Sequence, residues 1–509
     1  MRTTVRRKAV LVAGAGLAML LAACGGTRLS HAQIVADAGA VPDGPVVTTV
    51  VTGVTSAPTA GASTAPATSA PTTAAGGQSG PGPVVTNPQT STPTGSAPSA
   101  TSTGTASAKP TSKATSAAVS SGGVDQNGIP KPACAGTNHD TINIGNTGPY
   151  TATSAGTTVT PGRNILKIWA QQVNDNGGIC GRKVNLITED SKGSTSQDAA
   201  EVRDLVENQH VVAFVGQIPA LNLSGEQGYL ESKHVAVIGG DMGESVWYSS
   251  PVYFPQGATI GDVVYAVYKA AQSFPNGTKT ANIYCAESTA CKDGNDNVLR
   301  NHIDSAAGSQ LVYSKQVSLT QISFTSECQA AKAAGAGLLF LGGDGSFVER
   351  VANSCGQQGY NPVYGVVGLE VNSDQAANQY LNNHMIVGGA VQSWAATNTP
   401  GSAGYQKALQ TYAPNEPHSG VAMTNWGAAL LAQYVIGLIG DAPVTVSSVF
   451  DALYKVKGFT IGGLSGPLTF HPGNGQSTPQ CPSITLLQNG VFTAANGGNL
   501  FCRTGPPFK

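Results

Sequence analysis

Short apolar runs alternate with amphipathic stretches between residues 141 and 367, and this alternation restricts the chain to few folds. Residues 141–145 alternate like a strand, and residues 211–215 form the continuous apolar run of a buried parallel strand. Between them, Thr160 and Pro161 predict the N-cap and the first turn of a helix. Because strands that alternate with helices form parallel sheets covered on both faces, the sequence predicts an α/β fold.

The same alternation continues through two series of elements. Further strands are predicted at residues 183–188, 235–238, 281–284, 311–316, 338–341 and 363–367. Further helices are predicted after an N-cap at Ser196, up to Glu231, and over residues 295–307, 327–334 and 347–355. The two series separate near Pro255, which predicts two doubly wound parallel-sheet lobes with a cleft between them. Ligands bind such sheets at the carboxyl ends of the strands.

The first 24 residues have the layout of a secretory signal. Four basic residues within the first eight precede an uncharged apolar run over residues 9–23, which is shorter than the roughly 20 residues of a membrane-spanning helix. Cys24 directly follows Leu21-Ala22-Ala23, which resembles the lipobox of bacterial lipoproteins. We therefore expect residues 1–23 to be a signal peptide and Cys24 to carry a lipid anchor on the outer face of the cell membrane. An ordinary signal peptide followed by an incidental cysteine is the alternative.

Residues 24–125 consist largely of Thr, Ser, Ala, Pro, Gly and Val, with few charges. Such a segment has few large apolar side chains to bury, so it cannot offset the conformational entropy lost on ordering. The composition predicts a disordered tether of the kind that carries O-linked glycans. The folded part would then occupy residues 126–509.

Composition and motifs exclude several classes of function. The net charge is −1, charged residues make up 11% of the chain, and no basic stripe occurs, so nucleic-acid binding is not expected. The chain contains no G-x-S-x-G, H-E-x-x-H or G-x-x-x-x-G-K-[ST] motif. We therefore expect a binding protein without a cofactor rather than an enzyme.

Eight cysteines remain when Cys24 is set apart from the nine in the chain. An even number in an exported chain predicts disulfides, although eight cysteines allow many pairings. Proximity in the sequence favours Cys285–Cys291, Cys328–Cys355 and Cys481–Cys502, which leaves Cys134 with Cys180. A metal site is the alternative, but no C-x-x-C pair and no histidine at ligand spacing favours it.

Candidate ligand-binding residues follow the predicted strands of both series. They are Tyr150, Gln217, Ala220, Leu221, Asn222, Asp241 and Met242 in the first series, and Asp344 and Glu370 in the second. The three acids would point toward one cleft. Asp241 and Asp344 could equally be helix N-caps, whereas glutamate is a poorer capping residue, so Glu370 is the acid that the sequence most favours as a ligand contact.

Several segments, in order along the chain, resemble those of a known family. They are Ile-Gly-Asn-Thr-Gly-Pro at 144–149, Val-Asn-Asp-Asn-Gly-Gly-Ile-Cys-Gly-Arg at 173–182, Glu-Asp-Ser at 189–191 with Gln-Asp-Ala at 197–199, Val-Ala-Phe-Val-Gly at 212–216 and Gly-Gly-Leu-Ser-Gly-Pro-Leu-Thr-Phe at 462–470. Together they resemble the type I periplasmic substrate-binding proteins, in particular the leucine/isoleucine/valine-binding group. The resemblance spans residues 140–501.

The resemblance implies a bilobal clamshell in which the chain crosses between the lobes near Pro255, Gln392 and Ile484. Lobe 1 would comprise about 140–254 and 393–482, and lobe 2 about 255–392 and 483–509. Members of this family close on a small solute and deliver it to an ABC permease, so we expect a monomeric extracytoplasmic solute-binding lipoprotein without enzymatic activity. The alternatives are a ligand-sensing receptor that signals without transport and a structural lipoprotein with a vestigial cleft.

The family's binding residues match this sequence unevenly. Glu370 falls where the family places an acid that holds an ammonium group, and Tyr150 lies in the loop that covers the ligand. Asp344 lies in the loop that usually offers a tyrosine to the ligand. Residues 220–222 replace a serine-rich loop that holds a carboxylate, and Asp241 would repel one. The resemblance therefore implies a cationic, amide or polyol solute rather than a branched-chain amino acid.

Overall fold

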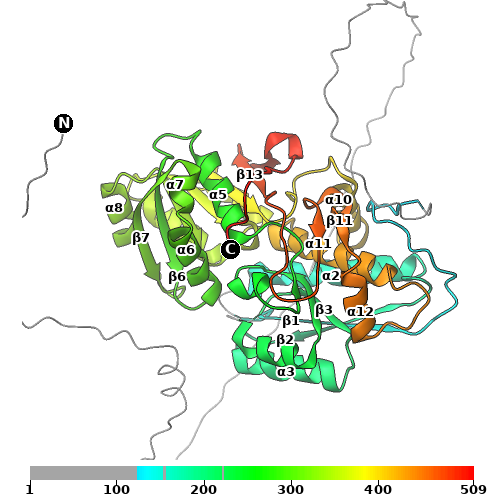
Figure 1. The fold of residues 1–509 in the computed structure, drawn as a ribbon. Helices are drawn as coiled ribbons and strands as arrows, with labels where there is room; N and C mark the ends of the chain where they lie inside the picture. Colours follow the sequence, from blue (N-terminus) through cyan, green and yellow to red (C-terminus); the bar gives the residue numbers. More distant parts are fainter. Residues whose placement is uncertain (1–122, 153–155, 220–222) are drawn as a thin grey trace, which may run out of the picture. The chain divides into compact units, whose positions relative to one another are not determined.

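The computed structural model describes residues 123–152, 156–219 and 223–509. Figure 1 shows two β-sheets with helices packed against them. Within the described residues, no helix is both long and apolar enough to cross a bilayer. The predictions that lie outside these residues concern the signal peptide at 1–23, the lipid anchor at Cys24, the tether as far as residue 122, and the ligand candidates Ala220, Leu221 and Asn222.

The first sheet has five parallel strands in the order β2-β1-β3-β4-β5. Its strands are β1 (Ile142–Gly148), β2 (Val184–Asp190), β3 (Ala213–Gln217), β4 (Ala236–Gly240) and β5 (Tyr253–Phe254). The helices packed with it are α2 (Gly156–Asp175), α3 (Thr195–Glu207), α4 (Gln227–Lys233), α10 (Pro400–Tyr412), α11 (Gly420–Gly437) and α12 (Val446–Leu453). Helices α2 and α11 pack on one face and α3 on the other, which confirms a doubly wound sheet.

The second sheet has seven strands in the order β14-β13-β10-β9-β8-β6-β7. Its strands are β6 (Lys279–Cys285), β7 (Gln310–Val317), β8 (Leu338–Gly342), β9 (Val363–Val367), β10 (Met385–Gly389), β13 (Ser483–Gln488) and β14 (Val491–Ala494). Its helices are α5 (Ile260–Ala271), α6 (Thr289–Arg300), α7 (Ile303–Ala307), α8 (Thr325–Ala333) and α9 (Gly345–Gly356). The predicted parallel pairing is confirmed from β6 to β10, and β13 and β14 add an antiparallel edge that was not predicted.

The chain visits the second sheet twice. After β10 it returns to the first sheet to form α10, α11 and α12, together with the hairpin of β11 (Lys457–Phe459) and β12 (Leu468–Thr469). It then re-enters the second sheet as β13, which pairs with β10. A hairpin can join antiparallel strands directly, which is why β13 leads to β14 after a short turn.

Three predicted helix boundaries differ from the structure. Helix α2 begins at Gly156, so Pro161 lies inside the helix rather than in its first turn. The N-cap of α3 is Ser194, whose side chain accepts a hydrogen bond from the Gln197 backbone, and not Ser196. The helix predicted at 295–307 is two helices, because His302 adopts a left-handed conformation between α6 and α7.

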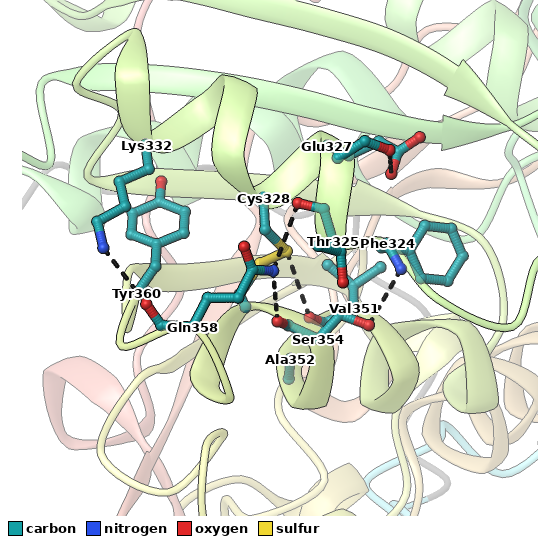
Figure 2. Close-up of a disulfide and its surroundings, with 12 residues drawn as sticks. Phe324, Thr325, Glu327, Cys328, Lys332, Val351, Ala352, Ser354, Gln358 and Tyr360 are labelled. Atoms are coloured by element: carbon teal, nitrogen blue, oxygen red, sulfur yellow. Dashed lines mark hydrogen bonds between the residues drawn. A yellow bond between two sulfur atoms is a disulfide. The ribbon is translucent and has the colours of Figure 1, made fainter.

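The four predicted disulfides are confirmed. Cys134 pairs with Cys180, which ties the segment before β1 to the turn that precedes β2. Cys285 pairs with Cys291 and joins the end of β6 to α6. Figure 2 shows the bond between Cys328 and Cys355, which joins α8 to α9. The fourth bond joins Cys481 to Cys502.

Candidate functional site

A cavity of about 180 Å³ lies where the carboxyl ends of strands from both sheets meet. The first sheet contributes the segments that follow β1, β3 and β4, and the second contributes those that follow β6, β8 and β9. Beside the cavity, the Gly345 backbone of α9 donates a hydrogen bond to Thr158 Oγ1 of α2 at 3.3 Å. A molecule in this cavity would therefore contact residues from both sheets.

Two carboxyl groups reach the cavity from the first sheet. Asp241 follows β4, and its Oδ1 accepts hydrogen bonds from Trp247 Nε1 at 2.8 Å and from the Gly243 backbone at 3.2 Å. Burial raises the pKa of Asp241 to about 6. Glu244 accepts a hydrogen bond from the Leu223 backbone at 2.8 Å. Burial, with the charge of Asp241 nearby, raises the pKa of Glu244 to about 7.

Asp344 reaches the cavity from the second sheet. Its Oδ1 accepts hydrogen bonds from the Phe347 backbone at 2.8 Å and from Ser346 Oγ at 2.6 Å, so Asp344 is the N-cap of α9. The helix-cap alternative is therefore confirmed for this residue. Its Oδ2 is buried and has no hydrogen-bond partner among the described residues, which leaves that oxygen available to a ligand.

Glu370 ends a short 3₁₀ helix that follows β9 and is 5% exposed. Its Oε1 accepts a hydrogen bond from the Gly343 backbone at 2.9 Å, and its buried Oε2 has no partner among the described residues. Burial raises the pKa of Glu370 well above its usual value, and the charge of Asp344 adds to the rise. A buried carboxyl group without a counter-charge is costly to ionise, and a bound cation would remove that cost.

Most of the remaining cavity wall is apolar. Pro149, Val159, Ile218 and Val421 come from the first sheet and its helices. Ile260, Val264, Val298, Leu319, Phe340, Val367 and Leu369 come from the second. Among the described residues that line the cavity, none is a lysine, arginine or histidine. The cavity thus combines four carboxyl groups with apolar walls.

Three predicted ligand residues do not line this cavity. Tyr150 is buried behind it, where its hydroxyl donates to Asn146 Oδ1 and the Arg163 guanidinium lies 4.6 Å from its ring centre. Gln217 is fully buried and donates to Thr147 Oγ1 at 2.6 Å. Met242 lines a neighbouring cavity of about 30 Å³. Direct ligand contact by these residues remains a prediction.

Two parts of the cavity wall were not predicted from the sequence, namely Glu244 and helix α6. Glu244 follows Asp241 by three residues in the same loop, and this spacing could have indicated a second carboxyl group. Helix α6 lines the cavity with Cys291, Gly294 and Val298, which recur at helical spacing. A glycine in the interior of a helix, here Gly294, was the sequence feature that could have indicated a close approach or an open space beside α6.

A family model described as periplasmic binding protein matches residues 141–490. No curated protein sequence matches the chain at a significant level.

Solved structures with the same fold include several solute-binding proteins. A possible leucine/isoleucine/valine-binding protein from Rhodopirellula baltica has a TM-score of 0.60 at 15% identity, covering 72% of this chain and 98% of that one. A fatty acid ABC transporter substrate-binding protein from Thermomonospora curvata has a TM-score of 0.59 at 14% identity, covering 74% and 96%. The branched-chain amino acid transporter substrate-binding protein of Streptococcus pneumoniae, in complex with isoleucine, has a TM-score of 0.56 at 16% identity, covering 71% and 100%.

These similarities agree with the two sheets, and their low identities support the fold alone. The family model covers well over half of the chain and includes the strands and loops that build the cavity. The chain therefore belongs to the periplasmic binding protein family.

Proposed function

We propose that this protein captures a small solute outside the cytoplasm and delivers it to an ABC importer. The observation that carries the proposal is that Asp241 and Glu244 from one sheet and Asp344 and Glu370 from the other line a single cavity. A solute that contacts both sheets favours the closed form over any form in which they separate. A permease can then distinguish the loaded protein from the empty one by its shape.

The N-terminal sequence supports the location that we propose. A lipid chain on Cys24 would hold the protein at the outer face of the membrane, and the tether up to residue 125 would let the binding domain reach a permease. One chain supplies the four carboxyl groups and a complete cavity wall, so we propose that the binding domain needs no second copy to hold its solute.

The solute that we propose carries a cationic group or a neutral hydrogen-bond donor on an apolar body. Four carboxyl groups line the cavity, and no basic side chain does among the described residues. The Streptococcus pneumoniae protein binds isoleucine and the Thermomonospora curvata protein belongs to a fatty acid transporter, and both kinds of solute carry a carboxylate. The apolar walls also argue against the polyol that the sequence left open, because burying many hydroxyl groups there would leave them without partners.

Three compounds with the same apolar body test this function: isopentylammonium, leucinamide and leucine. We expect the first two to bind in calorimetric titrations and to raise the melting temperature, because binding to the native state stabilises it. Leucine should bind at least about tenfold more weakly, since its carboxylate would enter a site lined by acids. Tight leucine binding would contradict the proposed solute, and failure of every small molecule tested would favour the vestigial cleft.

Variants of Glu370 provide the control for this test. Glu370→Ala should weaken cation binding by about 1–3 kcal/mol, as when a charged partner is lost. Glu370→Gln should weaken it by a similar amount, because glutamine keeps the shape and the acceptor oxygen but cannot become negative. Glu349→Gln, on α9 but outside the cavity wall, should bind like the parent protein. Full affinity in Glu370→Gln would mean that Glu370 does not act as an anion.

Cation binding is expected to strengthen as the pH rises. The pKa of Asp241 is raised to about 6 and that of Glu244 to about 7, so both groups are largely protonated in mild acid. A cation pairs with the ionised forms, and its affinity should be about tenfold or more higher near pH 8 than near pH 5. The stability of the unliganded protein should change the other way, because raised carboxyl pKa values lose their contribution as the pH rises through them. Titrations at the two pH values would show a constant affinity if the acids do not contact the solute.

A further inference from the structure

The cavity continues from the carboxyl groups into the space between the second sheet and two of its helices. Helices α5, α6 and α7 pack against one another over one face of this sheet (Figure 1). Val264 of α5 and Val298 of α6 line the cavity, although they belong to the apolar core of that face, and Phe340 of β8 is partly buried against this core and lines the cavity as well. Residues of this kind normally fill a core by touching one another. We call this part of the cavity the inner branch.

A glycine opens the inner branch. Gly294 lies in the interior of α6 and lines the cavity, and a Cβ atom added there would meet no heavy atom within 4 Å. Glycine in a helix interior costs about 1 kcal/mol relative to alanine, so helix stability does not favour it here. Its presence leaves room on the side of α6 that faces the cavity.

The amide group of Asn282, which lines the cavity in this region, already has its hydrogen-bond partners within the protein. Asn282 of β6 donates from Nδ2 to Asn295 Oδ1 at 3.2 Å, and its Oδ1 accepts a hydrogen bond from the Tyr268 hydroxyl at 2.7 Å. Both amide atoms of Asn282 are therefore bonded within the protein. A hydrocarbon group can occupy the inner branch without breaking either bond.

We infer that the inner branch binds an apolar tail, so that the solutes of this protein are amphipathic cations with an ammonium group at Asp344 and Glu370 and an alkyl or aryl chain beneath α6. The inference rests on the proposed function and specifies its substrate class. The whole cavity, with the part lined by carboxyl groups included, is about 180 Å³, and an apolar cavity of roughly 150 Å³ accepts benzene, so the cavity has room for a short tail. The apolar walls gain contact with the tail while the carboxyl groups gain a counter-charge.

A series of n-alkylammonium ions, from propylammonium to octylammonium, tests this inference on the intact protein. Each methylene that enters the inner branch should tighten binding about fourfold in calorimetric titrations, and the gain should end when the branch is full. In Gly294→Leu the side chain occupies the branch, so the longer ions should bind at least about tenfold more weakly than to the parent protein. Gly294→Ala is the milder variant, because it adds one methyl group: it should keep the gain per methylene and end that gain about one methylene earlier than the parent protein.

These measurements can reject the tail site without rejecting the solute-binding function on which it rests. If short and long ions bind equally well to the parent protein, or if Gly294→Leu keeps the full gain with length, the tail site is wrong and the solute-binding function stands. If no ammonium ion binds the parent protein at all, the cationic solute class is wrong together with the tail site, and the solute-binding function then depends on the neutral compounds. Should Gly294→Leu not fold, Gly342→Ala narrows the same cavity, with its Cβ 3.4 Å from Tyr284 Cβ. In that variant the gain in affinity with chain length should end about one methylene earlier than in the parent protein. If the gain ends at the same chain length, the inference is wrong.

Discussion

Replacement of Arg503 by methionine is expected to lower the free energy of unfolding by about 3–5 kcal/mol near pH 8. Arg503 Nε donates to Asp262 Oδ1 at 2.7 Å, and its Nη2 lies 2.6 Å from the same oxygen. The Asp262 side chain is fully buried at the start of α5, so without Arg503 a buried carboxylate would have no counter-charge. The bond also holds the segment after Cys502 against α5, whose Ile260 and Val264 line the cavity.

The pH dependence of this loss identifies its cause. Burial already raises the pKa of Asp262, and removal of Arg503 should raise that pKa further. The variant should therefore lose stability as the pH increases from about 4 toward the raised pKa, while Asp262→Asn with Arg503→Met should lose little over that range. Arg300→Met, at an exposed arginine of α6, should stay within about 0.5 kcal/mol of the parent protein in urea denaturation. A loss without pH dependence would point to side-chain packing instead.

Removal of the disulfide between α8 and α9 should have the next largest effect. Cys328 and Cys355 are separated by 27 residues, and opening a loop of that length costs about 3–4 kcal/mol by restoring entropy to the unfolded chain. Two hydrogen bonds beside the disulfide in Figure 2 should remain in Cys328→Ala with Cys355→Ala: Gln358 Nε2 donates to Ser354 O at 2.8 Å, and the Phe324 backbone to Ser354 Oγ at 3.1 Å. Such bonds within the folded state do not restrict the unfolded chain.

The disulfide between Cys285 and Cys291 provides the comparison, because those residues are separated by only 6 positions. The same pair of alanine substitutions there should cost about 1 kcal/mol less. Urea denaturation under oxidising conditions measures both losses. A loss below about 1 kcal/mol at Cys328 and Cys355 would mean that the surrounding contacts, rather than the covalent bond, hold α8 against α9.

The alternation of apolar runs predicted the α/β class and most strands, because buried parallel strands differ sharply in composition from the turns around them. Residues 363–367, for instance, are β9 with the predicted bounds. Helix starts were less predictable, since Ser194 and Ser196 are both good caps and only the packing of α3 selects between them. The sequence of β13 does not indicate that this strand pairs antiparallel with β10, because a pairing between distant strands is not encoded in either strand alone.

The residues of the candidate site that follow strands could be predicted from the sequence. The part of the site that depends on helix packing could not. Asp241, Asp344 and Glu370 follow strands, and parallel strands bring such positions to one edge. Tyr150 and Gln217 follow strands as well, yet they bond to Asn146 and Thr147 inside the protein. The direction in which a loop side chain points depends on such contacts, which the sequence does not reveal. The space beside Gly294 adjoins a helix that lines the cavity, and so had no counterpart in a strand pattern.

The late return of the chain to the second sheet affects how the protein can be made. A polypeptide synthesised from its N-terminus cannot complete this sheet until residues 483–494 have emerged, although its first strand appears some two hundred residues earlier. Until then β10 presents an unpaired edge to which another chain could add. Molecules truncated before β13 should therefore aggregate, and export before folding would keep that edge from persisting inside the cell.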